Sequence, residues 1–295
     1  MKNKIDFMAL VTVTHANPNG DPLADNRPRT NYQGLGEISN MCIKRKIRNR
    51  MQDMGHPIFV QSDDRRVDEY DSLKSRFDAL LKSLKLDKAH NSDKEKAMVN
   101  EWLDVRSFGA VAAFGKSNKQ KDDNSDEQDK GTSIGIRGPV TIQDAYSINN
   151  VVIATDQITK SVNSNSKDGK SSDTMGSKQT VEFGLYVIKG SINARLAEKT
   201  GFSDEDAEVI KECLKTLFEN DASSARPEGS MEVKKVFWWV HEGMDGCIPT
   251  AAVHRSVNIA LNDNVVTPTK WEDYTITTAP LPNGISATIY SPCEL

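Results

Sequence analysis

Cysteine, histidine and long apolar runs are scarce in this sequence, and each scarcity argues against a class of protein. The four cysteines lie far apart and none forms a CxxC pair, which argues against a disulfide framework or a zinc knuckle. The five histidines lack the short spacing of a helix-borne metal site. No apolar run approaches the roughly 18 residues that a membrane span needs. We therefore expect no metal, no cofactor and no membrane partner.

Targeting and base-stacking signals are also missing. An acid at Asp6 interrupts what would have to be the apolar core of a signal peptide, so we expect a cytoplasmic chain. Aromatic residues make up only 6% of the chain, and it lacks the aromatic RNP motif with which ordinary single-stranded-RNA domains stack bases. With 295 residues, 37% of them hydrophobic, the chain has enough apolar surface for one large domain or two.

Positive charge, in contrast, is concentrated in one short segment. Between positions 26 and 52 the chain has seven Lys or Arg and a single acid, Glu37, although the formal net charge of the protein is -4. A cationic face on an acidic protein indicates a polyanionic partner. The seven cations are Arg27, Arg29, Lys44, Arg45, Lys46, Arg48 and Arg50.

The pattern around this segment predicts a strand, a stiff loop and a helix. Residues 5–14 are nearly all apolar or β-branched, as in a central strand covered on both faces. Pro18, Pro22 and Pro28 then restrict the backbone of the loop. At about 100° per residue the helix that follows has one apolar stripe, and the cations should cover most of its exposed circumference. The stripe consists of Ile43, Ile47, Met51 and Met54.

The middle of the chain predicts insertions and a hairpin. Residues 61–100 are charged and contain a short amphipathic piece, which predicts a small helical insertion, and the highly charged residues 116–130 predict a mobile loop. Residues 134–142 read as one strand with a close backbone approach at its glycines. Residues 151–189 predict a long β-hairpin with a polar tip at 163–178.

The last third adds one helix and one strand. Ser203 and Asp206 form a capping box before an amphipathic helix, and residues 234–240 predict a strand with Trp238 and Trp239. We expect one tryptophan in the core and the other in a subunit interface. The resulting βαβ…βαβ skeleton suits an α+β, ferredoxin-like sandwich, which is the core that RNA-recognition domains also use.

Several motifs, in order along nearly the whole chain, resemble one family. They are Asn17-Pro18-Asn19-Gly20-Asp21-Pro22, Asn26-Arg27-Pro28-Arg29, Lys44-Arg45-Lys46-Ile47-Arg48-Asn49, Asp104-Val105-Arg106-Ser107-Phe108-Gly109 and Arg137-Gly138-Pro139-Val140. Further matches lie at Thr174-Met175-Gly176-Ser177-Lys178, Phe183-Gly184-Leu185-Tyr186 and residues 222–226. With these motifs the chain resembles the backbone subunit of the type I-C CRISPR Cascade complex.

The resemblance implies an architecture and a task. The palm, a modified RNA-recognition fold, would comprise residues 1–60, 101–150 and 181–295, with fingers at 61–130 and a β-hairpin thumb at 151–189. Several copies would line up head-to-tail along a CRISPR RNA, present its guide bases to target DNA and contact other Cascade subunits. On this interpretation the chain is a structural RNA-binding subunit and has no catalytic residues.

The candidate RNA contacts combine the motifs with the charge pattern. Because the RNP aromatics are missing, we expect sequence-independent binding through phosphates. Ser107 and Phe108 are equally suited to the core, and the cationic helix face could simply be solvated. The predicted set is Asn17, Asn19, Arg27, Arg29, Lys44, Arg45, Lys46, Arg48, Arg50, Ser107, Phe108, Arg137, Met175 and Lys178.

Two other functions stay open from the sequence. A metal-dependent endoribonuclease of the same superfamily would use an acid such as Asp21 or Asp104, but neither has a convincing histidine, lysine or metal cluster beside it. His15 lies close to Asp21 in sequence only. A nucleoprotein of unrelated origin would share the basic segment but not the ordered motifs.

Overall fold

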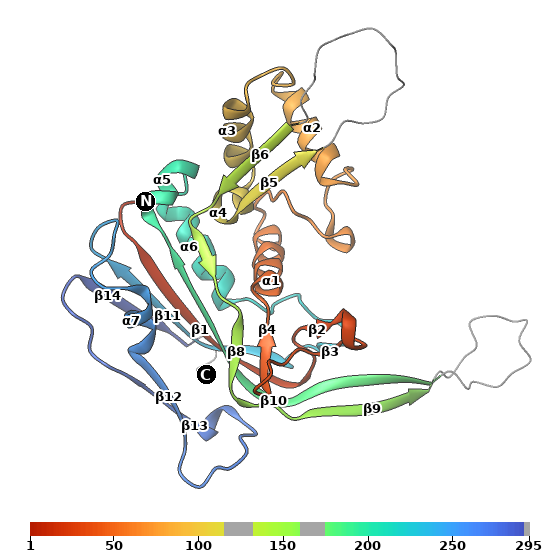
Figure 1. Cartoon of the computed structure of the whole chain (residues 1–295), viewed down its shortest axis with the longest axis vertical. Helices are drawn as coiled ribbons and strands as arrows, with labels where there is room; N and C mark the ends of the chain where they lie inside the picture. The colour runs from red at the N-terminus through yellow and green to blue at the C-terminus, as the bar shows by residue number, and fades with distance from the viewer. Residues whose placement is uncertain (115–131, 160–174, 292–295) are drawn as a thin grey trace, which may run out of the picture.

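One large antiparallel sheet dominates the computed structural model, which describes residues 1–114, 132–159 and 175–291 (Figure 1). Its strands are β1 (Ile5–Ala16), β4 (Leu35–Ile38), β7 (Val140–Ile142), β8 (Ala145–Asn150), β9 (Ile153–Thr159), β10 (Met175–Ile192), β11 (Met231–His241) and β14 (Ile285–Tyr290). The order is β14-β11-β1-β10-β8-β4, and β7 and β9 also pair with β10. β1 is therefore central, as the apolar run at 5–14 predicts.

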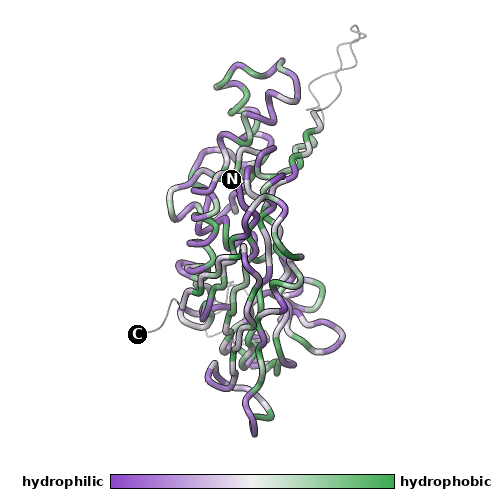
Figure 2. Tube along the Cα trace, turned by 90° about the vertical axis from the view of Figure 1, so that its left-hand side faces the viewer, coloured by the Kyte–Doolittle hydropathy of each residue, from purple (hydrophilic) through white to green (hydrophobic). Residues whose placement is uncertain are grey.

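Both faces of β1 are buried, because its side chains alternate between two apolar clusters. Phe7, Ala9 and Val11 lie in the larger cluster, whereas Met8 and Leu10 lie in the second. Helices α1 (Asn40–Asp53) and α6 (Asp204–Lys215) cover the first face. The second face is covered by α7 (Thr250–Arg255) and the ribbon of β12 (Val257–Leu261) and β13 (Tyr274–Thr278). Seen from the side, the molecule is long and narrow (Figure 2).

The two tryptophans of β11 belong to different sides of this core. Trp238 and Trp239 are each only 2% exposed. Trp238 stacks on Phe7 in the larger cluster, and Trp239 stacks on Phe237 in the second. The expectation that one of them lies in a subunit interface is wrong, because the chain itself covers both faces of β11.

Local sequence signals set the helix ends. The capping box of α6 forms as predicted, with the Asp206 amide donating to Ser203 Oγ at 3.1 Å and the Ser203 amide donating to Asp206 Oδ2 at 3.0 Å. α1 begins after Ser39, whose Oγ accepts from the Cys42 amide. The short helix α5 (Ala194–Thr200) precedes α6. The predicted stripe of α1 is buried at Ile43, Ile47 and Met51.

A smaller unit is inserted after α1. Helices α2 (Leu73–Ser83), α3 (Asn91–Glu101) and α4 (Leu103–Phe108) pack around a third apolar cluster together with the ribbon of β5 (Gly109–Phe114) and β6 (Thr132–Arg137). Helices α2 and α3 confirm the helical insertion predicted at 61–100. The loop predicted at 116–130, between β5 and β6, lies outside the described residues.

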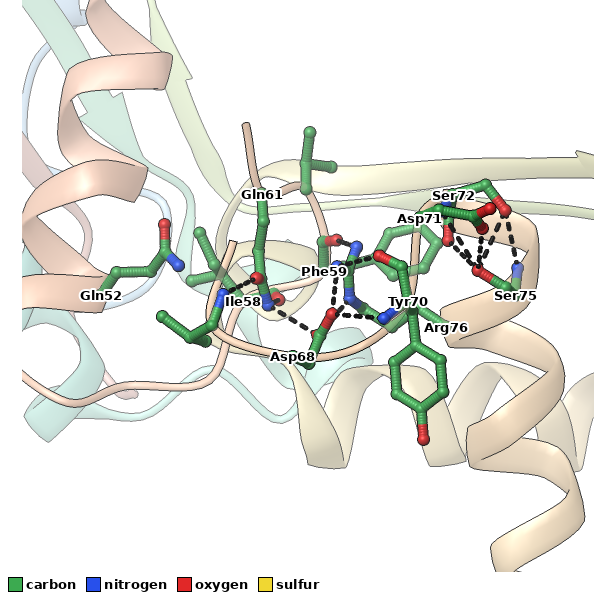
Figure 3. A network of polar contacts seen from close by, with 12 residues as sticks. Gln52, Ile58, Phe59, Gln61, Asp68, Tyr70, Asp71, Ser72, Ser75 and Arg76 are labelled. Carbon is green, nitrogen blue, oxygen red and sulfur yellow. Dashed lines mark hydrogen bonds and ion pairs between the residues drawn. The ribbon is translucent and has the colours of Figure 1, made fainter. Parts of the chain in front are cut away.

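A buried arginine of α2 ties the segment between α1 and α2 to this helix (Figure 3). The Arg76 guanidinium donates to both carboxylate oxygens of Asp68, at 2.7 and 2.8 Å, and to the Phe59 carbonyl at 2.8 Å. This bidentate pair lowers the pKa of Asp68. Phe59 and Asp68, which lie on either side of the turn η2 (Asp63–Arg65), are thereby tied to α2.

The strand predicted at 134–142 is divided in two. β6 pairs with β5 in the insertion, whereas β7 pairs with β10 in the main sheet. The division lies at Gly138, where a Cβ would lie 2.3 Å from the Ser107 carbonyl oxygen and 2.4 Å from the Gly109 amide nitrogen. The close approach at a glycine is thus confirmed, and the single continuous strand is wrong because the backbone changes sheets there.

The predicted hairpin is present as β9 and β10, which pair from Met175 opposite Thr159 to Val181 opposite Ile153. In Figure 1 the two strands project away from the main sheet. The second strand starts at Met175, so residues 175–178 belong to the strand and not to the predicted tip. The remainder of that tip, up to residue 174, lies outside the described residues.

The packing at Gly138 gives a testable prediction. We expect Gly138→Ala to lower the free energy of unfolding by about 1–3 kcal/mol, because its methyl group would meet backbone atoms that cannot rotate away. Urea unfolding measures the effect. Gly135→Ala in β6 is the matched control, since nothing lies within 4 Å of its added Cβ. Equal stability of the two variants would contradict the tight contact.

Candidate nucleic-acid interface

Helix α1 holds five of the seven cations of the basic segment, and its packing divides them between two sides. The buried stripe fixes the rotation of the helix on the sheet. Lys46 and Arg50 lie along one edge of the stripe, and Lys44, Arg45 and Arg48 lie on the other side. The two sides meet different parts of the chain.

The Lys46 side faces residues 216–221, and acids there neutralise it. Lys46 is 3% exposed and its Nζ pairs with Asp221. The Arg50 guanidinium contacts Asp53 at 2.9 Å and Glu219 at 3.0 Å. Burial lowers the pKa of Lys46, and Asp221 opposes that shift. The expectation that these two cations lie on the exposed circumference is wrong, because a segment distant in sequence folds over them.

The Lys44 side faces the insertion and keeps an excess of positive charge. Arg48 Nε donates to Asp104 Oδ2 at 2.7 Å, and the Arg48 guanidinium lies 5.0 Å from the centre of the Phe108 ring. Lys44 Nζ lies 5.5 Å from the same ring centre. The pKa of Lys44 is lowered, first by burial and then by Arg48. Among the described residues, Asp104 pairs with Arg48 alone, so this side, which also holds Lys44 and Arg45, keeps an excess of positive charge.

Arg45 supplies an unused donor on this side. Its Nη2 donates to the Val60 carbonyl at 2.6 Å. Its Nη1 is buried without a hydrogen-bond partner among the described residues. A buried N–H without an acceptor is unfavourable, so the Arg45 guanidinium is only partly satisfied by its contacts within the chain.

The predicted asparagines of the loop build the site instead of facing outward. Asn19 Oδ1 accepts from both the amide and the hydroxyl of Ser39 at 2.9 Å, which joins the loop to the start of α1. Asn17 is buried, and its Nδ2 donates to the Asn26 carbonyl at 2.6 Å. Both residues therefore position the neighbouring arginines.

Those arginines lie on the small ribbon of β2 (Gly20–Asp21) and β3 (Arg27–Pro28) and just after it. Arg29 Nη2 lies 3.3 Å from Asp21 Oδ1. Arg27 is exposed, and its Nη1 donates to Gln179 Oε1 of β10 at 3.3 Å. This contact brings the loop to the root of the hairpin, one residue from Lys178.

The other predicted residues fall into two places. Ser107 is buried, and its Oγ donates to the Leu103 carbonyl. Arg137 is exposed and pairs in the β5–β6 ribbon with Gly109, the residue that follows Phe108. Met175 and Lys178 lie on β10, opposite Thr159 and Asp156. The structure thus forms one cationic group around Phe108 and another at the hairpin root.

Sequence reasoning missed Arg226 as a member of this region. Arg226 Nε lies 3.2 Å from Asp221 Oδ2, so it shares this carboxylate with Lys46. Lys46, Arg226 and Arg29 all act on the Cys42 thiol, whose pKa burial nevertheless raises. The signal that could have indicated Arg226 is its place in residues 222–226, one of the segments that resemble the family.

The two acids considered as catalytic residues accept hydrogen bonds that hold the chain's own backbone and side chains. Asp104 is fully buried and accepts from Arg48 and from the amides of Phe59 and Val60 at 2.7 and 3.1 Å. Asp21 accepts from the Leu23 amide at the start of the turn η1 (Pro22–Ala24). Within the described ranges, no three His, Cys, Asp or Glu side chains form a group that could hold a metal ion. No helix there is long and apolar enough to cross a membrane.

The sequence pattern of the family described as CRISPR-associated protein Cas7 matches residues 3–279. The chain belongs to the Cas7 family. It is 26% identical over 240 residues to a "CRISPR-associated protein Cas7" of Haloferax volcanii, a match that covers 75% of this chain and 66% of that protein, just under two thirds of its length. The resemblance to a CRISPR backbone-subunit family is thereby confirmed at the family level, and the type I-C subtype stays a prediction.

Solved structures show more distant similarity to this Cas7-family chain. A subunit of a "CRISPR RNA-guided surveillance complex, pre-nicking" is 15% identical, with a TM-score of 0.48 and coverage of 90% of this chain and 84% of that one. A chain of a type III-B Cmr-beta complex bound to cognate target RNA is 10% identical, with a TM-score of 0.39 and coverage of 79% and 60%.

The neutralised side of α1 gives a second prediction. We expect Asp221→Ala to destabilise the protein by about 3 kcal/mol, because it leaves the buried Lys46 ammonium without its partner. Adding Lys46→Met should recover part of the loss by removing the unpaired charge. Urea unfolding of both single variants and the double variant forms the test. A variant Asp221→Ala as stable as the wild type would show that the pair is not buried in solution.

Proposed function

We propose that this Cas7-family chain is a non-catalytic backbone subunit of a Cascade-type complex, several copies of which bind one CRISPR RNA. The observation that carries the proposal is the side of α1 that holds Lys44, Arg45 and Arg48, where Asp104 pairs with Arg48, Lys44 lies over the Phe108 ring and Arg45 donates to the Val60 carbonyl. An acidic chain that keeps three cations together on one helix is suited to a polyanion. The family match supplies the kind of polyanion.

The topology supports a ferredoxin-like palm of the RNA-recognition type. The order β11-β1-β10-β8, with α1 and α6 on one face, corresponds to the predicted βαβ…βαβ skeleton. In this proposal the palm comprises residues 1–60, 101–150 and 181–295, the insertion at 61–130 forms the fingers, and the hairpin at 151–189 forms the thumb. Each of the latter two projects from the main sheet in Figure 1.

RNA would be bound through its phosphates by the accessible cations. Arg27 and Arg137 are exposed, whereas Arg29, Lys44, Arg45, Arg48 and Lys178 are partly exposed. Lys46 and Arg50 support the helix from its neutralised side, and Asn17, Asn19 and Ser107 position the backbone. Phosphate contacts carry no base preference, which suits a subunit that accepts any guide sequence.

The wider partnership follows from the same role. CRISPR RNA held by its backbone leaves its bases free to pair with target DNA. Copies would contact one another head-to-tail, an interface that does not close on itself, and the end copies would meet other Cascade subunits.

The salt dependence of binding tests the phosphate contacts. We expect the triple variant Arg27→Ala, Lys44→Ala, Arg137→Ala to flatten the slope of log affinity against log salt by about 2, since each lost phosphate contact on a single strand contributes about 0.7. Fluorescence anisotropy with single-stranded RNA measures it. The control variant Lys82→Ala, Lys88→Ala, Lys199→Ala removes the same charge from exposed positions on α2, the loop after it and α5. Equal slopes for both triples would reject the proposed path.

The same RNA separates the scaffold from the alternative endoribonuclease. Labelled RNA incubated with the protein and Mg²⁺ or Mn²⁺ should stay intact and become protected in proportion to bound protein. Site-specific cutting that Asp21→Asn or Asp104→Asn abolishes would establish the nuclease instead.

The hairpin stem gives a prediction for assembly. β9 is exposed along most of its length, and a two-stranded ribbon is only marginally stable alone, so it should be completed by a neighbouring copy. We expect Ile158→Asp to reduce long RNA-bound assemblies in sizing and light scattering while single-copy RNA affinity changes little. Ile289→Asp on edge strand β14 is the control, because the two isoleucines are 52% and 48% exposed. Full-length assemblies with Ile158→Asp would exclude the stem from the interface.

A further inference from the structure

Two large apolar side chains near the basic segment stand almost completely in solvent. Tyr32 and Leu23 are each 98% exposed, more than any other large hydrophobic residue in the described ranges. Neither contributes to any of the three apolar clusters. Packing within the chain therefore does not explain why a tyrosine lies at this place.

The turn that carries Tyr32 is well ordered. Asn31 Oδ1 accepts from the amides of Gln33 at 2.9 Å and Leu35 at 3.0 Å, and the Asn31 carbonyl accepts from the Gly34 amide at 3.0 Å. Below the turn, Thr30 pairs with Gly36, and the Glu37 amide donates to the Arg29 carbonyl. The Val151 amide donates to the Gly34 carbonyl, which ties the turn to the root of the hairpin.

This rigidity makes Tyr32 efficient in binding. A tyrosine has only two side-chain torsions to fix, and the backbone of this turn is already held by hydrogen bonds. A ligand that covers the ring therefore costs little conformational freedom, and most of the contact contributes to affinity. A tyrosine ring also offers a flat face, which unpaired nucleobases use for stacking irrespective of their identity. The residue therefore supplies what the absent RNP aromatics would supply elsewhere.

The surroundings favour a nucleic-acid base over an apolar protein surface. Arg29 lies at the foot of the turn, three residues before Tyr32, which limits their Cα separation to about 10 Å in extended backbone. Arg27 is exposed on the adjoining ribbon. A strand whose phosphates follow these arginines would bring a base within reach of the ring.

We propose that Tyr32 is a stacking platform for an unpaired base of the RNA bound at this interface. The proposal rests on the proposed RNA-binding function and adds a base contact to its phosphate contacts. Tyr32 thus contributes affinity without sequence preference, and the Asn31 turn fixes the backbone that carries the ring.

The test compares Tyr32→Ala and Tyr32→Phe on a short single-stranded RNA that contains 2-aminopurine, and on the same RNA with abasic sites. We expect Tyr32→Ala to raise the Kd for the base-containing RNA by about 5- to 100-fold. The salt slope should not change, because no phosphate contact is lost. Tyr32→Phe keeps the ring and should bind like the wild type. The wild type should bind the abasic RNA as weakly as Tyr32→Ala binds the base-containing RNA. Tyr70→Ala, in the insertion, is the control for the loss of a tyrosine.

Three results would overturn the proposal. One is a wild-type Kd for Tyr32→Ala, and another is equal wild-type affinity for base-containing and abasic RNA. The third is a loss of self-association in Tyr32→Ala with RNA affinity unchanged, which would make a second copy of the chain the occupant. If the wild type binds no single-stranded RNA at all, the proposed function fails as well, so the two failures are distinct. Because Tyr32 is exposed, circular dichroism should show both Tyr32 variants folded.

Discussion

The rotation of α1 on the sheet is the constraint on which the rest of the interface depends. The apolar stripe at Ile43, Ile47 and Met51 allows the helix only one orientation over β1, and that orientation determines which cation meets which neighbour. Lys46 is directed under the 216–221 segment, whereas Arg48 is directed toward Asp104 in α4. A helix rotated by one residue would exchange a neutralised cation for an accessible one. The hydrophobic core therefore also arranges the charges.

The sequence was sufficient for those parts of the fold that depend on local patterns. The continuous apolar run of β1, the period of 3.6 in α1 and the capping box of Ser203 each describe neighbours within a few residues, and each is confirmed. The sequence was insufficient where the structure depends on contacts between segments that are distant in sequence. Asp221 reaches Lys46 across 175 positions, and no local pattern shows that a basic helix is half neutralised by such a segment. The prediction that one tryptophan lies in a subunit interface failed for the same reason, because β12 and β13, from the end of the chain, pack in the cluster that holds Trp239.

The candidate site shows a similar division between residues that build and residues that bind. Asn17, Asn19 and Ser107 occur in motif-like segments, yet their side chains bond to backbone or to Ser39 inside the chain. Gly138 acts in the same way, since only a glycine lets β6 and the end of α4 approach so closely. A motif read from sequence contains both kinds of residue. Burial and hydrogen-bond partners separate them, and neither can be read from residue type alone.

Pairing with acids does not make a cation useless for binding a polyanion. Arg48 is held by Asp104 on one side and by the Phe108 ring on the other, so its guanidinium is fixed before any ligand arrives. A free surface arginine would lose rotamer freedom on binding, whereas a fixed one loses little. The Asp104 carboxylate reduces the net charge of the site, but Lys44 and Arg45 on the same side of α1 keep it positive. On the proposed function, a chain with net charge -4 would therefore bind RNA backbone locally while its acidic surface repels it, which would confine the strand to the path beside α1.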